Sequence, residues 1–408
     1  MAAAEKQGKN LSDIQEINRS LVLNTLREKP DSSRSAIAQI TGLQQATITK
    51  IVNDFIDWGI VSESGLLKSS GGRRSIGLRL NSNQYRIISV RLQRTNITAG
   101  LYDIAGKGYT FIKEPIEIAR GAEAAVATMI SVIRALIAEA EGNTLLGIGI
   151  GLPGPYLRDR GIITVMADFP GWEGKKIQEQ LENEFGPIVY AEHDAQANAL
   201  AEWWFGRQRE GETTLLSVSM EEGLGAGLIL NGKPYFGKQG IAGEIGHISI
   251  DYNGLPCPCG SRGCLRNYCS DTAVLRIAHA GRRKHPESSL YHREAFSLAD
   301  VIDAAKKGDS YAVSLLHEAG TNLGYGLINV IYMYNPGVIV LSRQFSGAGD
   351  LFLDAVRDVL RRRLPKEIAD AVRVVFSSLT EDPVLMGMAA LVTDSAFKTP
   401  SEALDIRK

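Results

Sequence analysis

The chain has 408 residues, of which 44% are hydrophobic and 22% charged, and its formal net charge is −1. This composition is typical of a globular protein and excludes disordered and fibrous classes. The length exceeds that of one ordinary core, so we expect one small and one large domain, or three comparable units. The N-terminal residues lack the apolar segment of a signal peptide, and no run reads as long and uncharged enough to span a bilayer. We therefore expect a cytoplasmic protein without membrane insertion.

Residues 11–64 carry the pattern of three helices. Apolar residues recur at helical spacing in the first helix, which must end at Pro30 because proline cannot continue it. Ser33 can cap a short second helix that ends at Gly42, and a third helix covers about 44–58. A short helix, a glycine turn and a longer helix form the outline of a helix-turn-helix.

The solvent face of the third helix is the part that would enter the major groove of DNA. Residues 1–80 hold 11 Lys and Arg against 8 Asp and Glu, a balance that permits phosphate contact without proving it. Two short strands with a glycine tip between them predict a β-hairpin wing after the helix. The DNA-binding candidates are Gln44, Gln45, Thr47, Thr49, Lys50 and Asn53 on the helix and Arg73 and Arg74 on the tip. The alternative is a three-helix bundle used for dimerisation.

Beyond a boundary at 81–83, short apolar strands alternate with helical stretches, which predicts an α/β architecture. The candidate strands are 87–92, 98–102, 146–151, 188–191, 214–219, 226–230, 338–341 and 372–376. The candidate helices are 122–141, 194–205, 297–334, 349–362 and 383–396.

All four cysteines lie close together, which argues for a local metal site rather than scattered disulfides. The metal-ligand candidates, spaced H-x9-C-x-C-x4-C, are His247, Cys257, Cys259 and Cys264. Three thiolates and one imidazole close a tetrahedral zinc site without an open position, so the ion would be structural. The alternative is a set of buried free thiols beside an unrelated histidine, and we interpret Cys269 as a small core residue.

The stretch 244–264 resembles the E-x-G-H and C-x-C-G-x-x-G-C signature of the ROK family, which groups repressors, uncharacterised reading frames and sugar kinases. The stretch 147–155 resembles the family's glycine-proline turn at the sugar cleft, and His193-Asp194 looks like the pair in the branch of N-acetylglucosamine, glucose and xylose repressors. The resemblance implies an actin/hexokinase-like (ribonuclease H-like) sugar-kinase fold of two α/β lobes with the sugar between them.

The expected domains follow from this resemblance. They are a winged helix-turn-helix at 1–80, a first α/β lobe at 81–193 and a second lobe at 194–382 with the zinc loop and an oligomerisation surface. The C-terminal helix, 383–396, is expected to pack back on the first lobe.

Three stretches depart from what similar kinases need to bind ATP. The metal-handling D-x-G-G-T stretch is Arg91–Thr95, the second phosphate loop is Glu221–Gly225, and the late Gly-Gly is Ser342-Arg343. Carboxylates at the phosphate position would repel a nucleotide, and long side chains replace glycines. We therefore expect no ATP, no catalytic residues and no enzyme activity.

The resemblance also implies a sugar pocket. Its expected residues are Gly154, Asp168, His193, Asp194, Glu244, His247 and Arg266. Asp194, the base in kinases, is assigned only hydrogen bonding to the ligand. Arg266 stands where the family usually has a sugar-binding Glu, so either the effector is acidic or phosphorylated, or Arg266 pairs with an acid such as Asp168 and the effector is neutral.

These features together predict a sugar-responsive regulator that represses carbohydrate genes. Sugar would close the lobes of a homodimer or homotetramer and weaken its binding to double-stranded operator DNA. One alternative is an active ROK sugar kinase with an appended DNA-binding domain. Another is a regulator whose signal is a protein partner, such as a membrane sugar transporter.

Overall fold

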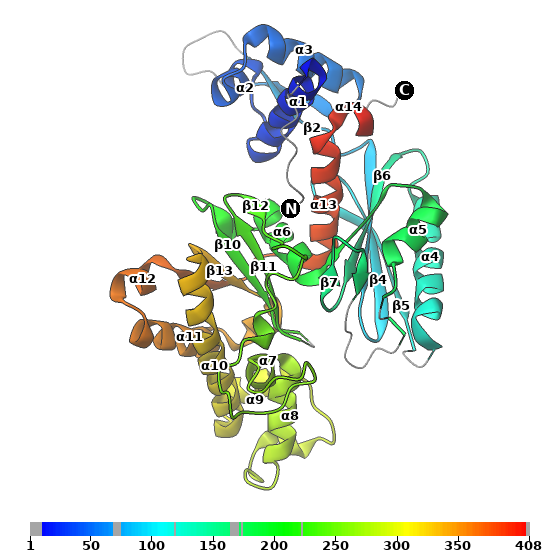
Figure 1. The fold of residues 1–408 in the computed structure, drawn as a ribbon. Coiled ribbons are helices and arrows are strands. Elements are labelled where there is room, and N and C mark those ends of the chain that lie inside the picture. Colours follow the sequence, from blue (N-terminus) through cyan, green and yellow to red (C-terminus); the bar gives the residue numbers. More distant parts are fainter. Residues whose placement is uncertain are drawn as a thin grey trace. The chain divides into compact units, whose positions relative to one another are not determined.

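A computed structural model describes residues 10–67, 75–117, 120–163, 171–172, 174–221 and 223–404. The chain divides into two compact units, whose elements are drawn in Figure 1. The first unit comprises Met1–Leu152, Lys175–Glu192 and Met388–Lys408, and the second comprises Pro153–Gly174 and His193–Gly387. The first 80 residues therefore cluster with the sheet that follows them.

The first unit begins with three helices and a hairpin. These are α1 (Leu11–Glu28), α2 (Arg34–Thr41), α3 (Gln45–Asp57), β1 (Val61–Leu66) and β2 (Ile76–Leu80), with the two strands antiparallel. Ser33 caps α2 by accepting a hydrogen bond from the amide of Ala36, as predicted, and Gly42 ends that helix with a φ of 72°. The apolar faces of α1, α2 and α3 meet in a fully buried core of Leu23, Ile37, Val52 and Phe55.

The sheet of the first unit has the strand order β5-β4-β3-β6-β9. Its strands are β3 (Tyr85–Leu92), β4 (Asn96–Tyr102), β5 (Gly108–Pro115), β6 (Thr144–Leu152) and β9 (Val189–His193). β3 pairs parallel with β6 and antiparallel with β4. Helices α4 (Gly121–Glu139) and α5 (Ile177–Phe185) lie on one face, and α13 (Pro383–Lys398) lies on the other (Figure 1). Gly147 and Gly149 lack the side chains that would collide with Val392 and Met388 of α13. The short helix α14 (Pro400–Ala403) follows α13.

Helix α4 corrects the expectation that no run is apolar enough to span a bilayer. Within the described part of the chain it is the one helix that passes that test by length and composition. One side of α4, including Met129, Ile133 and Leu136, is buried and packs on the sheet, as a core helix does.

The sheet of the second unit has the order β12-β11-β10-β13-β14. Its strands are β10 (Leu215–Ser219), β11 (Gly225–Leu230), β12 (Lys233–Pro234), β13 (Val338–Leu341) and β14 (Arg373–Phe376), and a separate small hairpin joins β7 (Tyr156–Leu157) to β8 (Ile162–Ile163). The helices are α6 (Asp194–Phe205), α7 (Arg266–Cys269), α8 (Asp271–Gly281), α9 (Leu298–Lys306), α10 (Ser310–Tyr334), α11 (Asp350–Arg363) and α12 (Lys366–Ala371). Gly227 lets β11 approach the backbone of α6 at Ala195, and Gly320 and Gly324 let α10 pack closely on α11.

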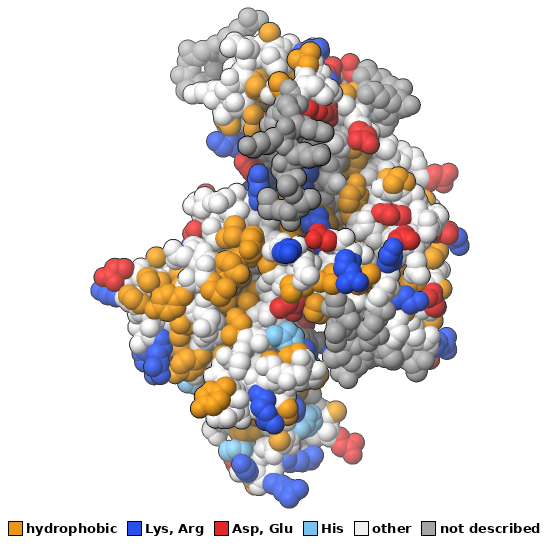
Figure 2. Space-filling view, in the orientation of Figure 1, with side chains coloured by type: hydrophobic (Ala, Val, Ile, Leu, Met, Phe, Trp, Pro, Cys, Tyr) orange, Lys and Arg blue, Asp and Glu red, His pale blue; other side chains and the backbone are white. Residues whose placement is uncertain are grey.

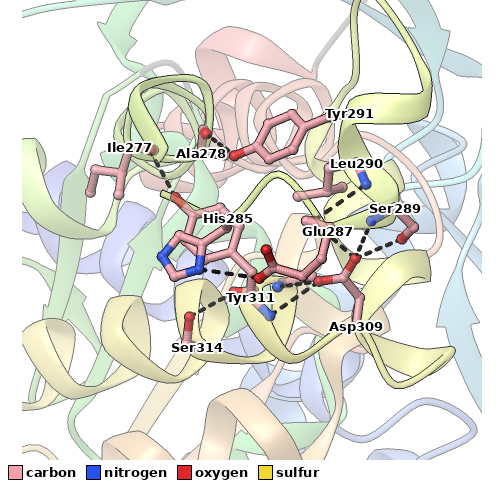
Figure 3. Close-up of polar contacts among 12 residues, drawn as sticks. Ile277, Ala278, His285, Glu287, Ser289, Leu290, Tyr291, Asp309, Tyr311 and Ser314 are labelled. Carbon is pink, nitrogen blue, oxygen red and sulfur yellow. Dashed lines mark hydrogen bonds and ion pairs between the residues drawn. The ribbon is translucent and has the colours of Figure 1, made fainter. Parts of the chain in front are cut away.

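The connection from α8 to α9 is fastened to the start of α10 (Figure 3). Asp309 caps α10 and also accepts hydrogen bonds from the backbone amide and hydroxyl of Ser289, and these bonds hold the pKa of Asp309 at about 2 although its partial burial would raise it. The ring of Tyr311 stacks on His285 with 4.0 Å between centroids, and its hydroxyl donates to the carbonyl of Ile277. The connection is thereby an ordered part of the second unit.

The helix expected over 297–334 is two helices, because Gly308 takes a φ of 89° and Asp309 caps a new helix. Strand β5 and helices α5 and α8 are additional to the predicted elements. β5 is an edge strand with little buried surface, so a search for buried apolar runs does not find it.

Candidate DNA-binding, metal and sugar sites

The predicted DNA-contacting face of α3 is open to solvent. Gln44, Gln45, Thr49, Lys50 and Asn53 are exposed and Thr47 is half-buried. Gln44 precedes α3 without capping it through its side chain, so its side-chain amide is not used at the start of the helix. Asn53 accepts a hydrogen bond of 3.3 Å from Arg34 of α2. The predicted wing residues Arg73 and Arg74 lie outside the described residues.

Arg19 of α1 holds the C-terminal part of α3 through contacts with Asp54 and Trp58. Its guanidinium forms an ion pair of 2.9 Å with Asp54 of α3 and lies over the ring of Trp58, 5.2 Å from the ring centroid. It also donates to Ser401 of α14 at 2.6 Å and to Glu16 at 3.1 Å. The sequence prediction missed these contacts of Arg19. Ser401 lies 382 residues further along the chain, and no local sequence pattern joins it to Arg19.

Tyr85 makes a second link at the same place. Its buried hydroxyl lies 2.7 Å from the carbonyl oxygen of Trp58, which follows α3, and 3.2 Å from that of Leu404, which follows α14. The N-terminal helices, the first strand of the sheet and the C-terminal helix therefore meet at one buried group.

The four predicted metal ligands lie together. The ligand atoms of His247, Cys257, Cys259 and Cys264 are all within 4.8 Å of one another. Cys259 Sγ is 3.6 Å from Cys264 Sγ, and Cys257 Sγ is 3.8 Å from His247 Nδ1. A tetrahedral ion with Zn–S bonds of about 2.3 Å would separate two sulfurs by about 3.8 Å, and the Cys259–Cys264 separation is close to this value.

The electrostatics of these residues also fit a cation. Burial first, and then the neighbouring thiols of Cys257 and Cys259, together raise the pKa of Cys264 to about 12. Burial lowers the pKa of His247, a change that favours the neutral imidazole needed for metal binding. A bound Zn²⁺ would offset the repulsion among the thiolates. Cys269 is fully buried and packs in the core, and burial raises its pKa.

The second polar cluster, which we call the carboxylate–histidine cluster, consists of His193, Asp194 and Glu244. His193 Nε2 lies 3.2 Å from Asp194 Oδ1 and 3.9 Å from Glu244 Oε1. Asp194 is the first residue of α6, and Glu244 precedes the short 3₁₀ helix Ile245–His247 without capping it through its side chain. Two carboxylates and an imidazole so arranged can accept from and donate to the vicinal hydroxyls of a sugar.

The remaining predicted sugar residues are placed differently. The pKa of His247 is lowered by burial, raised by the charge of Glu244 and lowered by the charge of Arg266. Gly154 is in the turn between β6 and β7 with a φ of 77°. Asp168 lies outside the described residues.

Of the three stretches that depart from a nucleotide site, the structure describes Arg91–Thr95 and Ser342-Arg343 in full and Glu221–Gly225 in part. Arg91 is a buried side chain one residue before the end of β3, and Gln93 and Asn96 close a tight turn after that strand. Arg343 donates to the carbonyl oxygens of Leu379 and Thr380, which ties the end of β13 to the loop before α13. Glu221 is described, whereas its neighbour at 222 lies outside the described residues.

Comparison with known proteins gives a consistent picture. A family model described as "ROK family" matches residues 87–395. The xylose repressor of Caldicellulosiruptor bescii is 28% identical over 96% of this chain and 98% of its own length. A solved structure of a ROK family transcriptional regulator, a homolog of the Escherichia coli Mlc protein, covers 96% of this chain and all of its own with 26% identity and a TM-score of 0.84. A ROK family glucokinase from Streptomyces griseus, solved with glucose and AMPPNP, covers 75% of this chain and 98% of its own with 29% identity and a TM-score of 0.66. The likeness to kinases confirms the predicted α/β sugar-kinase fold.

Proposed function

The chain belongs to the ROK family, and from that premise we propose that it is a sugar-responsive, DNA-binding transcriptional regulator that acts as a repressor. The observation that carries the proposal is the extent of the likeness. The repressor and the regulator match almost the whole chain, whereas the glucokinase matches only three quarters of it. A regulator needs a DNA-binding part that a kinase does without.

The proposed DNA-binding part is residues 1–80, folded as a winged helix-turn-helix with α3 as the recognition helix and β1–β2 as the wing. The exposed amides of Gln44, Gln45 and Asn53 suit the reading of base edges, and Thr47, Thr49 and Lys50 suit phosphate contacts. In this proposal Arg73 and Arg74 contact the minor groove or the backbone.

The proposed effector site is the carboxylate–histidine cluster together with Gly154, Asp168, His247 and Arg266. His193 begins the longer of the two segments of the second unit, where the chain leaves the first unit at Glu192. A ligand held there would bias the arrangement of the two units, and a coupling of about 1–3 kcal/mol would change operator affinity roughly 5- to 150-fold. The proposed zinc ion at His247 and the three cysteines has a structural role, since four protein ligands leave no position for a reactant.

We propose further that this chain does not transfer phosphate. The buried Arg91 and the bonded Arg343 stand where the resemblance to kinases expects an aspartate and a glycine at the nucleotide. Sugar-dependent ATP hydrolysis by the purified protein would contradict this part and favour a kinase with an appended DNA-binding domain.

A homodimer or homotetramer is proposed as the active form, because operators are bound by symmetric oligomers. Figure 2 shows hydrophobic side chains gathered over the second unit near β12. The ring of Tyr235, which follows β12, lies 6.0 Å from that of Tyr334 at the end of α10. Tyr235 and the α10 residues Tyr325, Tyr332 and Met333 are exposed large apolar side chains of a kind that marks protein contacts. This form would act in the cytoplasm, where its DNA is.

The experiment is fluorescence anisotropy with labelled DNA from upstream of the protein's own gene, at fixed salt, while neutral and acidic sugars are titrated. Binding that one sugar releases, with random DNA bound far more weakly, is the expected result. If no sugar releases the DNA and no sugar shifts the melting temperature, the signal is better explained by a protein partner such as a sugar transporter. If operator and random DNA bind alike, the proposal fails.

A further inference from the structure

Helix α10 is the longest helix that the structure describes, and one of its faces is left uncovered. The opposite face, which includes Leu316, Leu323 and Val330, is buried against α9 and α11. The uncovered residues recur at alternating steps of four and three, the spacing of a helix seam that contacts a second helix along its length. This set, which we call the α10 seam, consists of Ser314, Glu318, Thr321, Tyr325, Ile328 and Tyr332, none of which is buried.

The composition of α10 differs from that of an ordinary solvent-facing helix. In its 25 residues Glu318 is the one acidic residue, and there is no lysine or arginine. The neighbouring helix α11 carries three aspartates and four arginines in 14 residues. Tyr332 is 60% exposed and Met333 is 67% exposed. Few charges together with exposed aromatic and methionine side chains are typical of a protein–protein interface.

The N-terminal half of the α10 seam is hollow, whereas large side chains project from its C-terminal half. Ser314 does not project, because its hydroxyl donates to the carbonyl oxygen of Tyr311 one turn earlier (Figure 3). A depression of about 450 Å³ lies over this half, and it is lined by Ser310, Val313, Ser314, His317, Glu318 and Thr321. A helix face with a hollow at one end and projecting rings at the other is complementary to a second copy that runs antiparallel to it.

The spacing of the α10 seam gives the register of such a pair. Its members lie at equal distances on either side of residue 323, so a two-fold axis at that point brings them together in twos. Tyr332 of each copy then lies over Ser314 and the depression of the other. The remaining pairs across the axis are Glu318 with Ile328 and Thr321 with Tyr325.

Charges match in the same register. Arg363 of α11 reaches the α10 seam, where its guanidinium donates to the Tyr325 hydroxyl at 3.3 Å and lies 5.5 Å from the centroid of that ring. The register places Tyr325 opposite Thr321, which is one turn from the exposed carboxylate of Glu318. Arg363 of each copy therefore comes close to Glu318 of the other, and the two-fold axis repeats this pair.

We propose that α10 is the contact between two copies of this chain, packed antiparallel about a two-fold axis near residue 323. Tyr332 of each copy fills the depression of the other, and Glu318 pairs with Arg363 across the interface. This inference rests on the proposed regulator, which needs a symmetric oligomer, and it names the surface that forms one. A lipid surface is a poorer occupant, because it would meet the Glu318 carboxylate and the hydroxyls of the depression.

The test is sedimentation equilibrium on the full-length protein and its charge-reversal variants Glu318→Arg and Arg363→Glu. In a symmetric pair of either variant, like charges meet twice across the axis. In a mixed pair of the two variants, each introduced charge faces an opposite charge. An interaction within one chain cannot be restored by mixing, so the equimolar mixture tests the contact between copies directly.

Further variants complete the experiment. Tyr332→Ala removes the projecting ring without reversing a charge. Two control substitutions reverse exposed charges elsewhere, Glu139→Arg on α4 and Arg283→Glu in the α8–α9 connection. Melting temperatures establish that every variant is folded.

We expect Glu318→Arg and Arg363→Glu each to weaken self-association at least about 10-fold, because like charges brought together in an interface cost several kcal/mol. The equimolar mixture should recover wild-type association to within roughly threefold, a difference below 1 kcal/mol. Tyr332→Ala should weaken association about 10-fold, as expected for a central aromatic contact. The two controls should associate as the wild type does.

A monomeric wild type, single variants that associate normally, or a mixture that is no better than its components would each overturn this inference. Operator binding, measured separately by anisotropy, decides the proposed regulatory function. A protein that binds its operator but does not associate through α10 keeps that function and loses this interface. A protein that associates through α10 but binds operator and random DNA alike keeps the interface and loses the function.

Discussion

Arg19 of α1 donates a hydrogen bond of 2.6 Å to the hydroxyl of Ser401 in α14, which lies at the far end of the chain. The amide of Ser401 in turn donates to Glu16 at 3.0 Å, and its hydroxyl also donates to Glu16. Burial would raise the pKa of Glu16, but the hydrogen bonds from Ser401 and Arg19 outweigh it and lower that pKa. The last helix of the chain is thus joined to the residue that positions the proposed recognition helix.

The same C-terminal segment connects to the proposed effector site. Gly387 of α13 packs so closely on α6 that a methyl group there would lie 1.7 Å from the carbonyl oxygen of Ala197. Helix α6 begins with Asp194, and α13 continues from Gly387 into the first unit at Met388. Helix α13 is thus packed on α6 within the second unit and continues along the chain into the first unit, where α14 follows it.

We predict that Ser401→Ala weakens operator binding about 2- to 10-fold, because Arg19 loses an acceptor worth about 0.5–1.5 kcal/mol and holds Asp54 of α3 less firmly. Anisotropy at fixed salt measures the effect. Glu402→Ala, an exposed neighbour on the same helix, is the control and should bind as the wild type does. Equal affinity of the Ser401→Ala protein and the wild type would show that α14 is a structural support only.

Two substitutions on α3 should change DNA binding in different ways, one in sequence preference and the other in overall affinity. Gln45→Ala is predicted to reduce the preference for operator over altered sequences by about 1–3 kcal/mol, as expected for a lost base-edge contact. Lys50→Ala should weaken binding to all sequences alike and lower the slope of affinity against salt by about 1, because it removes one phosphate contact. Titrations on operator and mutated operator at several salt concentrations separate the two. If both variants keep wild-type affinity and preference, α3 is not the recognition helix.

Loss of one proposed zinc ligand is predicted to destabilise the protein. Cys264→Ser should lower the zinc content well below one ion per chain and reduce the melting temperature by about 10 °C, since the folded state loses a tightly bound ligand. Elemental analysis and a thermal melt with and without a chelator are the measurements. Cys269→Ala is the matched control, because Cys269 lies outside the cluster in the core and should leave the zinc content unchanged. Normal zinc in the Cys264→Ser protein would rule out the proposed ligand set.

Much of the local structure could be predicted from the sequence, because its signals are local. The Ser33 cap, the end of α2 at Gly42 and the clustering of the metal ligands around a cysteine loop follow from residues close together in the chain. The break at Gly308 was also readable as a glycine before a capping aspartate, but the apolar periodicity on both sides concealed it.

The long-range parts could not be predicted. The Arg19–Ser401 contact and the buried Tyr85 hydroxyl depend on tertiary packing between distant segments, and no spacing encodes them. The sequence indicated that Arg266 was unusual, yet only the structure gives its neighbours. Family resemblance placed His193, Asp194 and Glu244 in one site, and the structure gives the distances that join them.

The last prediction concerns a buried acid that no proposed function uses. Burial raises the pKa of Glu202 on α6 to about 7, against a smaller opposing effect of the Ser377 hydroxyl. Since the folded-state pKa lies above the ordinary value of 4.5 for a glutamate, the stability that the protonated form provides is fully present below pH 4.5 and is lost as pH rises through about 7. The loss by pH 8 should be roughly 3 kcal/mol at most.

Glu202→Gln mimics the protonated acid, so we expect it to match the wild type near pH 5 and to be more stable at pH 8 in urea unfolding. Glu210→Gln, at an exposed position, should follow the wild type at both values. A wild-type protein whose stability does not fall relative to Glu202→Gln between pH 5 and 8 would mean that Glu202 is ionised at little cost, through solvent that reaches its carboxylate.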